Sequence, residues 1–266
     1  MAVKKLYING EWVNASGGTL PAYNPATEEV IAEFGFGNAV DVDAAVDAAT
    51  AALRDPAWRD LAPAARARLL FQLADLMQEH TEEFAELETL NQGQPLAMSR
   101  GAVASAAEHF RYFAGWITKI HGLTSPIAFP NTHQYTRREP MGVCALITPW
   151  NLPLGILSWK VAPALATGNT IIIKPAEQTP LTAIKLVELA EQLGFPRGVI
   201  NLVTGDGTTG QALVDHPGVN KGSFTGSTEV GRTIVAGAAA SNLKRVTLEL
   251  GGKAPSIIAA DADRDA

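Results

Sequence analysis

Two polar side chains lie beside turns where they could take part in carbonyl chemistry. Asn151 follows the apolar run VCALIT within TPWNLP, and its amide can donate hydrogen bonds to a developing oxyanion. Glu249 lies in LELGGK, where a β-like run ends at a glycine pair that lets backbone approach a ligand closely. A carboxylate at such a position can act as a general base. Asn151 alone also fits a plainer role, because asparagine is a common turn residue.

Two further runs could bind a nucleotide. Lys174 and Glu177 follow TIIIK, where they could grip ribose hydroxyls or simply form a solvated ion pair. Gly226 and Ser227 lie where SFTG passes into a helix, and free N–H groups at a helix start favour a phosphate. The same run also fits an ordinary helix cap by Ser227 or Thr228.

A glycine pattern follows the run GVINLVT. Gly205 to Gly210 match G-x-G-x-x-G, with Glu229 near the position expected for an acidic ribose ligand. One interpretation is the dinucleotide fingerprint of a classical two-domain dehydrogenase. The other is a tight strand–helix turn in which glycines are needed for steric reasons. The pattern alone leaves both open.

The second half of the chain must position these groups. Short β-rich runs alternate there with helix-length segments, which is typical of a parallel sheet with helices on both faces. The five runs are VCALIT, TIIIK, GVINLVT, KGSFTG and KRVTLEL. Ligands of such α/β sheets bind at the carboxyl ends of the strands, so we expect the polar groups to meet at one edge.

The first half reads as a hairpin followed by helices. Asn9-Gly10 between two β-like runs predicts a tight hairpin. Helical periodicity predicts helices over residues 38–53, in two segments between 63 and 93, and over 96–122. Thr81 is the expected N-cap between the two middle segments, and Gly93 the expected C-cap. The run HQYTRREP alternates like an exposed strand.

Composition narrows the class of protein. With 266 residues, 47% hydrophobic and 18% charged, the chain can bury a core, and a net charge of −6 argues against a nucleic-acid surface. One cysteine excludes an internal disulfide, and five scattered histidines lack metal-ligand spacing, so no metal is expected. Residues 141–159 carry no charge, but Pro149, Asn151 and Pro153 would break a membrane helix. Without a signal-like N-terminus, we expect a cytoplasmic protein.

Taken together, TPWN, KPAE, FTGSTEVG and LELGGK in this order and spacing resemble the aldehyde dehydrogenase superfamily. The resemblance covers the whole chain, including YNPATEEVIAEF and RREPMGV. It implies a Rossmann-like NAD-binding domain over residues 1–122 and 142–251, an oligomerisation β-hairpin over 123–141 and the start of a truncated catalytic domain over 252–266. It also implies NAD-dependent oxidation of an aldehyde to a carboxylic acid, and a homo-oligomer for a full-length member.

The resemblance assigns roles residue by residue. Asn151 matches the residue that stabilises the oxyanion, and Glu249 the general base that activates the hydrolytic water, partly buried at its strand end. Glu177 would repel a 2′-phosphate, which favours NAD over NADP, and Gly205 to Gly210 become a decoy with Gly207 near the adenine. The implied cofactor-binding residues are Thr148, Pro149, Trp150, Asn151, Lys174, Pro175, Ala176, Glu177, Gly207, Gly226, Ser227 and Leu250. The implied substrate-lining residues are Leu152, Ile156 and Trp159.

The chain departs from the family pattern in one respect. The family nucleophile is a cysteine that follows the general base, whereas Cys144 precedes Asn151 within an apolar run. We expect Cys144 to be a core thiol, because apolar burial suppresses the thiolate. The chain is therefore expected to supply the cofactor site and general base but to be inactive alone. The alternative is a naturally short NAD-binding pseudoenzyme or interaction module.

Overall fold

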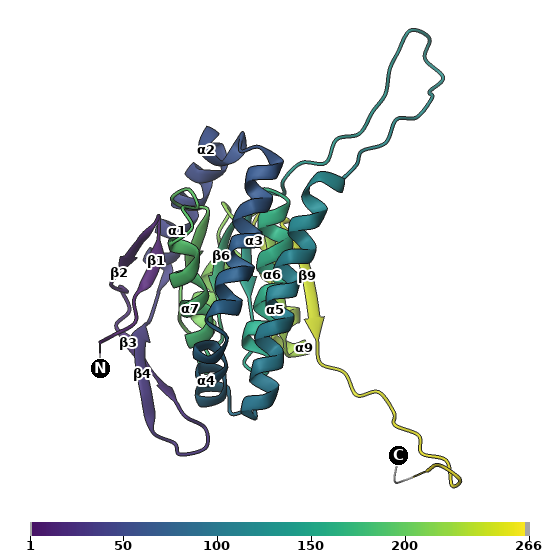
Figure 1. Cartoon of the computed structure of the whole chain (residues 1–266). Helices are drawn as coiled ribbons and strands as arrows, with labels where there is room; N and C mark the ends of the chain where they lie inside the picture. Colours follow the sequence, from purple (N-terminus) through teal and green to yellow (C-terminus); the bar gives the residue numbers. More distant parts are fainter. Residues whose placement is uncertain (1, 264–266) are drawn as a thin grey trace.

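A seven-stranded sheet in the order β2-β1-β7-β6-β5-β8-β9 forms the centre of the computed structural model, which describes residues 2–263. Its last five strands are mutually parallel, which confirms the predicted parallel sheet (Figure 1). They are β5 (Val143–Ile147), β6 (Thr170–Lys174), β7 (Ile200–Leu202), β8 (Lys221–Gly226) and β9 (Arg245–Leu250). Strands β5, β6 and β7 are buried along their whole length, as a sheet covered on both faces requires.

The predicted Asn9-Gly10 hairpin extends this sheet at one edge. Strands β1 (Leu6–Ile8) and β2 (Glu11–Val13) are antiparallel, and β1 pairs with β7. Asn9 has φ 53° and Gly10 φ 76°. A two-residue loop with both φ values positive is the turn whose twist matches the flanking strands. A separate two-stranded sheet of β3 (Thr19–Tyr23) and β4 (Val30–Gly35), not predicted from the sequence, lies nearby in Figure 1.

Helices cover both faces, and the strand side chains alternate between them. Cys144 and Leu146 of β5 join the core formed with α3, α5, α6 and α7, whereas Val143 and Ala145 join the core formed with α1 and α8. The helices are α1 (Ala39–Arg54), α2 (Pro56–Arg59), α3 (Pro63–Glu79), α4 (Thr81–Gln92), α5 (Leu96–Trp116), α6 (Pro153–Ala166), α7 (Leu181–Glu191), α8 (Gly207–Asp215) and α9 (Thr228–Ala240). Within residues 2–263, no helix is both long and apolar enough to cross a membrane.

Two predicted helix boundaries are wrong and one is confirmed. Thr81 is not an N-cap: it is the first residue of α4, and its hydroxyl donates to the carbonyl of Gln78 at 2.6 Å. The flanking residue is His80, whose ψ of 24° is not the extended conformation that a side-chain cap uses. Gly93 ends α4 in the left-handed conformation, with φ 91°, as predicted. Helix α5 ends at Trp116 and passes into the 3-10 turn η1 (Ile117–Lys119), short of residue 122.

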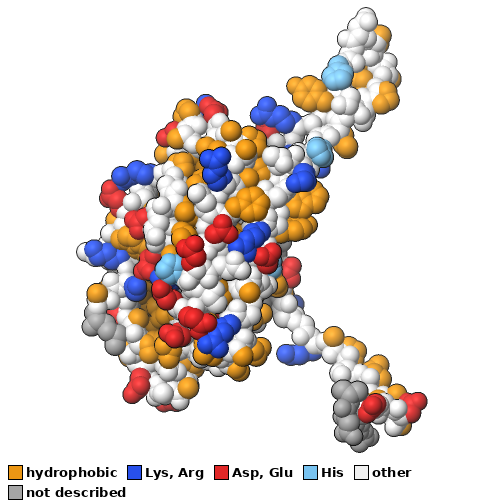
Figure 2. All heavy atoms as spheres, viewed as in Figure 1, with side chains coloured by type: hydrophobic (Ala, Val, Ile, Leu, Met, Phe, Trp, Pro, Cys, Tyr) orange, Lys and Arg blue, Asp and Glu red, His pale blue; other side chains and the backbone are white. Residues whose placement is uncertain are grey.

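The segment 123–141 runs out from the body and back (Figure 1) but does not form the expected regular hairpin. Thr124 and Tyr135 make its one isolated bridge among the described residues. The physical reason is that both of its faces are in solvent, where two strands alone are marginally stable. Leu123, Phe129 and Tyr135 are 68%, 72% and 66% exposed, and Figure 2 shows apolar side chains gathered along this segment.

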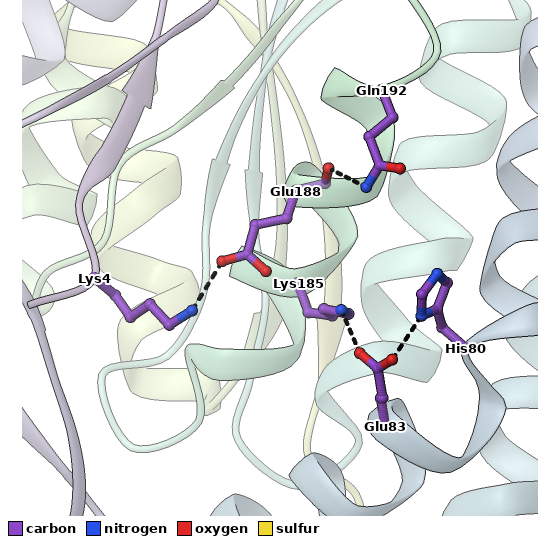
Figure 3. Close-up of polar contacts among 6 residues, drawn as sticks. All are labelled: Lys4, His80, Glu83, Lys185, Glu188 and Gln192. Atoms are coloured by element: carbon purple, nitrogen blue, oxygen red, sulfur yellow. Dashed lines mark hydrogen bonds and ion pairs between the residues drawn. The ribbon is translucent and has the colours of Figure 1, made fainter. Parts of the chain in front are cut away.

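Ion pairs link the N-terminal arm, the residues that precede β1, to the helices (Figure 3). Lys4 pairs with Glu188 of α7 at 2.8 Å, while Glu83 of α4 accepts from both Lys185 and His80. These side chains are partly or mostly exposed, so each pair contributes only about 0–1 kcal/mol to stability. Their effect is to hold the arm beside α7 and α7 beside α4.

Candidate active site

Strand register brings the polar turns to one edge of the sheet. Ile147, at the end of β5, lies opposite Lys174 of β6 on one side and Phe224 of β8 on the other. In the next pair, Thr225 lies opposite Glu249, and Gly226 opposite Leu250. The segments that follow β5, β6, β8 and β9 therefore leave the sheet together, as expected from the parallel arrangement.

The turn after β5 carries Asn151. The Thr148 N–H donates to the carbonyl of Lys174 at 3.1 Å, which fixes the start of the turn against β6. Helix α6 then begins at Pro153, a residue suited to the first helical position because it lacks an N–H. Asn151 is exposed between these two anchors, with its amide free of protein partners in residues 2–263. It is thus available to a ligand.

Side chains of helix α4 hydrogen-bond to the backbone of this turn. The Gln92 side-chain amide donates to the main-chain carbonyl of Asn151 at 3.0 Å, and Glu88 accepts from the Leu154 N–H at 3.3 Å. Glu88 is 1% exposed, and burial raises its pKa to about 7. Asn91 completes the group by accepting from the Leu181 N–H at the start of α7. Sequence reasoning missed these residues, although their three- and four-residue spacing in ETLNQ places polar groups on one helix face.

Lys174 and Glu177 form the expected pair after β6. Lys174 is 4% exposed, and burial lowers the pKa of its ammonium, while the Glu177 and Asp206 carboxylates act in the opposite direction. The Nζ to Glu177 Oε2 distance is 3.6 Å, longer than a hydrogen bond. The two side chains form an ion pair in which Lys174 is buried and Glu177 is partly exposed. The pair is therefore only partly solvated.

The two glycine-containing helix starts differ in charge. Asp206 is the N-cap of α8, and its carboxylate accepts from the Thr208 N–H at 2.8 Å and the Thr208 hydroxyl at 2.6 Å. Ser227 is the N-cap of α9, where its neutral hydroxyl accepts from the Val230 N–H at 3.2 Å. Glu229 also places a carboxylate in the first turn of α9, so the two helix starts differ for an anion only in the charge of the cap itself. Thr228, the other candidate cap, is the first residue of α9.

Glycine is required at two of these positions for different reasons. A Cβ on Gly226 would lie 2.4 Å from Cζ of Phe224, so a side chain there would force the Phe224 ring to move. Gly205 has φ 156°, and a Cβ there would lie 2.0 Å from the Thr209 hydroxyl oxygen. By contrast, a Cβ on Gly207 would meet nothing within 4 Å. Gly205 is thus a packing glycine, while Gly207 faces open space.

Two adjoining pockets collect the predicted residues. The first, of about 290 Å³, runs from Lys174, Glu177 and Gly207 to Gly226 and Ser227. The second, of about 420 Å³, contains Asn151 and Glu249. The residues common to both are Pro149, Trp150, Thr225, Gly226 and Ser227. Thr148 and Ala176 line the first, and Leu250, Ile156 and Trp159 the second.

Two predicted residues line neither pocket. Pro175 is buried between Lys174 and Ala176. Leu152 is the residue before α6 and is 42% exposed outside the second pocket. Its place before Pro153, in a turn that projects from the edge, accounts for this difference.

The sequence profile of the aldehyde dehydrogenase family matches residues 12–266. The chain belongs to the aldehyde dehydrogenase family. It is 51% identical over 267 aligned positions to phenylacetaldehyde dehydrogenase of Pseudomonas fluorescens. That match covers 97% of this chain and 53% of the Pseudomonas protein. It is 51% identical over 265 residues to retinaldehyde dehydrogenase 3 of Mus musculus, covering 98% of this chain and 52% of that protein.

A solved structure supports the same assignment. The NAD+ complex of aldehyde dehydrogenase from Bacillus cereus has a TM-score of 0.95 and 48% identity, covering 98% of this chain and 54% of that chain. This chain therefore spans about half the length of the relatives it matches. Membership of the aldehyde dehydrogenase family sets aside the classical two-domain dehydrogenase as the interpretation of Gly205 to Gly210.

The aldehyde dehydrogenase motif LELGGK places Glu249 on the outermost strand. Glu249 is exposed, so the expected partial burial is wrong: β9 is the edge strand and nothing in residues 2–263 covers its outer side. Lys160 of α6 is a buried residue near this edge that was not predicted from the sequence. Its Nζ donates to the Ser223 hydroxyl at 2.9 Å. Burial lowers the pKa of Lys160 to about 8, against the opposing attraction of the Glu249 carboxylate.

Cys144 is a core thiol, as predicted. It lies in β5, is 2% exposed, and its Sγ lies 3.8 Å from the carbonyl of Gly142. Burial raises its pKa to about 12. A thiol in this setting does not ionise near neutral pH and does not reach either pocket. Within residues 2–263, no three His, Cys, Asp or Glu side chains gather in a metal-binding group.

Proposed function

We propose that this chain forms the NAD-binding part of an enzyme that oxidises an aldehyde to a carboxylic acid, and that it contributes the oxyanion donor and the general base. Family membership and the NAD+ complex of the Bacillus cereus relative support the proposal. The observation that carries it is the pair of adjoining pockets, one with Lys174 and Glu177, the other with Asn151 and Glu249.

The buried Lys174 ammonium suits the ribose of NAD. It lies in the first pocket, 3.6 Å from the Glu177 carboxylate, and ribose hydroxyls would offer it acceptors at hydrogen-bond distance. Glu177, at the same end of the pocket, would accept from those hydroxyls and repel a 2′-phosphate. NAD is therefore favoured over NADP. When bound, NAD supplies the acceptor for the hydride of the aldehyde.

The start of α9 suits the pyrophosphate. Gly226 and Ser227 line both pockets there, and the Ser227 cap itself adds no negative charge, although Glu229 lies in the first turn of α9. The start of α8 already carries the Asp206 carboxylate, which would repel a phosphate. We therefore assign the phosphates to Gly226 and Ser227, and the adenine end to Gly207.

Asn151 and Glu249 act on the carbonyl carbon in the second pocket. The Asn151 amide donates to the oxygen that gains charge when a thiolate adds to the aldehyde. After the oxidation, Glu249 takes a proton from water as the water oxygen bonds to the acyl carbon and the thiolate leaves. Cys144, the one cysteine here, is buried within strand β5, so the attacking thiolate is assigned to a residue outside these 266.

Apolar side chains dominate the substrate side of the second pocket. Ile156 and Trp159 of α6 and Trp150 of the preceding turn line it. We assign an aldehyde with an apolar substituent as the substrate class. Relatives named as phenylacetaldehyde and retinaldehyde dehydrogenases agree with this assignment.

Two organisational features belong to the same proposal. Residues 1–122 and 142–251 form the NAD-binding domain, and 252–266 begin the catalytic domain, with residues 1 and 264–266 outside the described residues. The segment 123–141 pairs between subunits of a homo-oligomer. Its exposed apolar side chains and unpaired backbone are the features that favour association.

Titration of this chain with NAD tests the cofactor assignment. Lys174→Met should weaken NAD binding by at least about tenfold, which corresponds to ~1.4 kcal/mol. The matched control is Lys185→Met, which removes a lysine that pairs with Glu83 on α4 (Figure 3) and does not line the first pocket. Glu177→Ser should narrow the preference for NAD over NADP. Unchanged binding by Lys174→Met, or equal losses in the two lysine variants, would contradict the assignment and favour an interaction module.

A further inference from the structure

Trp159 is a half-exposed aromatic wall of the second pocket. It lies on α6, is 53% exposed, and lines the pocket that contains Asn151 and Glu249. Gly155, one helical turn earlier on the same face, has open space where a Cβ would stand. The shape of the pocket on this side therefore depends on where the Trp159 indole points. A half-exposed indole needs a partner for its N–H to keep one orientation.

His109 of α5 supplies that partner. The Trp159 Nε1–H donates to Nε2 of His109 at 2.8 Å, and Nδ1 of His109 lies 2.7 Å from the Ser158 hydroxyl. The two rings meet edge to face, with centroids 5.7 Å apart and planes at 67°. His109 lies 50 residues before Trp159 in the sequence, so only the packing of α5 against α6 reveals the contact.

The hydrogen-bond chain permits one tautomer. An indole nitrogen can only donate, so Nε2 of His109 must accept and the neutral imidazole carries its hydrogen on Nδ1. That hydrogen goes to the hydroxyl of Ser158, which is fully buried. Ser158 in turn donates to the carbonyl of Gly155 at 2.7 Å. Every hydrogen in the chain has one acceptor, and the last acceptor is helix backbone.

We propose that His109 is a positioning residue for Trp159: with Ser158 it holds the indole in one orientation as the pocket wall. An apolar aldehyde then packs against a fixed aromatic surface. The orientation of the Trp159 indole sets how large a substituent the pocket can hold. The role as a substrate wall rests on the proposed function. The orientation itself does not, and it can be measured in this chain directly.

The first test is the tautomer of His109. Nitrogen chemical shifts of the imidazole ring at neutral pH should show a hydrogen on Nδ1 and an unprotonated Nε2. A hydrogen on Nε2 would overturn the proposal, because that nitrogen could not accept from the indole. This measurement needs no variant and does not depend on NAD binding or turnover, so it stays informative if the proposed function fails.

The second test compares two substitutions of His109. His109→Leu removes the acceptor, and His109→Gln keeps an amide oxygen that can accept and an amide nitrogen that can donate to Ser158. The Trp159 indole N–H signal, assigned by its loss in Trp159→Phe, should exchange with water at least about tenfold faster in His109→Leu, and close to the wild-type rate in His109→Gln. The internal control is Trp58, whose indole donates to the carbonyl of Gly168 at 3.0 Å.

The outcomes separate positioning from loss of fold. A Trp58 signal that stays unchanged while Trp159 exchanges faster supports the proposal. Equal Trp159 exchange in His109→Leu and the wild type, with Trp58 unchanged, would overturn it. If His109→Leu disturbs Trp58, Ser158→Ala serves instead, since it removes the acceptor of Nδ1–H and should make the Trp159 indole N–H exchange faster. Unchanged Trp159 exchange in Ser158→Ala, with Trp58 unchanged, would count against the proposal.

Discussion

The side-chain amide of Gln92 holds the main-chain carbonyl of Asn151 at 3.0 Å. Four residues earlier on the same helix, Glu88 holds the amide of Leu154. The last turn of α4 thus anchors both sides of the turn that presents Asn151 at the pocket. A helix that contributes no side chain to either pocket thereby positions the turn that carries Asn151, the proposed oxyanion donor.

Gln92→Met should displace Asn151 as well as weaken the fold. Loss of one partly exposed hydrogen bond should lower the free energy of unfolding by about 0.5–1.5 kcal/mol. The control is Gln192→Met, because Gln192 also donates to a main-chain carbonyl, that of Glu188, at 3.2 Å on α7 (Figure 3). Urea unfolding should give similar losses for both. Only Gln92→Met should shift the side-chain amide resonances of Asn151, and identical spectra would refute the anchoring role.

Glu88 should make stability fall as pH rises. Its pKa in the folded chain is about 7, above the ordinary 4.5, so the folded state holds a proton that the unfolded state has lost. Between these values the free energy of unfolding decreases with pH, by up to about 3 kcal/mol for this shift. Glu88→Gln should remove that slope, whereas Glu86→Gln, at an exposed position of α4, should keep it. Parallel pH profiles for the wild type and Glu88→Gln would show the slope to have another source.

His109 should make the free energy of unfolding fall as pH decreases, the opposite of the effect of Glu88. Burial lowers its pKa below the ordinary 6.5, and its recorded polar partners among the described residues are Ser158 and Trp159, neither of them charged. As pH falls from 6.5 through the lowered pKa, the unfolded state takes up the proton first and the free energy of unfolding decreases. Protonated Nε2 can no longer accept from Trp159. The fluorescence of Trp159, measured as the difference between the wild type and Trp159→Phe, should therefore change on acidification. The same difference, measured between His109→Gln and His109→Gln with Trp159→Phe, should stay constant.

The segment 123–141 should promote self-association. Serine at Leu123, Phe129 and Tyr135 removes three large exposed apolar side chains from an unpaired segment. Light scattering at increasing concentration should show less association for this triple variant. The control is Val40→Ser, which removes an exposed apolar side chain from α1. A wild-type chain that stays monomeric at every concentration would contradict the assignment of this segment to subunit pairing.

The sequence predicted those parts of the fold that depend on residues close together in the chain. The five parallel strands follow from short β-rich runs that alternate with helices, and the first hairpin follows from Asn9-Gly10, whose backbone preference selects the turn. Thr81 fails as an N-cap because helices α3 and α4 meet at His80 without an extended residue. The segment 123–141 lacks regular strands because both of its faces are in solvent, where two strands alone are marginally stable.

Contacts between distant helices account for what the sequence could not predict. Gln92 reaches Asn151 across 59 residues, and His109 reaches Trp159 across 50. No spacing rule links such pairs, since they meet only after α4, α5 and α6 have packed. The pocket residues were predictable for another reason: parallel strands end at one edge, so TPWN, KPAE, FTGS and LELG had to meet there.

NADH production from simple apolar aldehydes tests the central claim most directly. The assay compares this chain, its Cys144→Ala variant, and the chain extended by the catalytic half of a family member, with and without Glu249→Gln. We predict turnover only in the extended protein, and its loss on Glu249→Gln, because Cys144 is buried with a pKa of about 12 and Glu249 needs a thioester to act upon. Turnover by the 266-residue chain that disappears in Cys144→Ala would contradict the account.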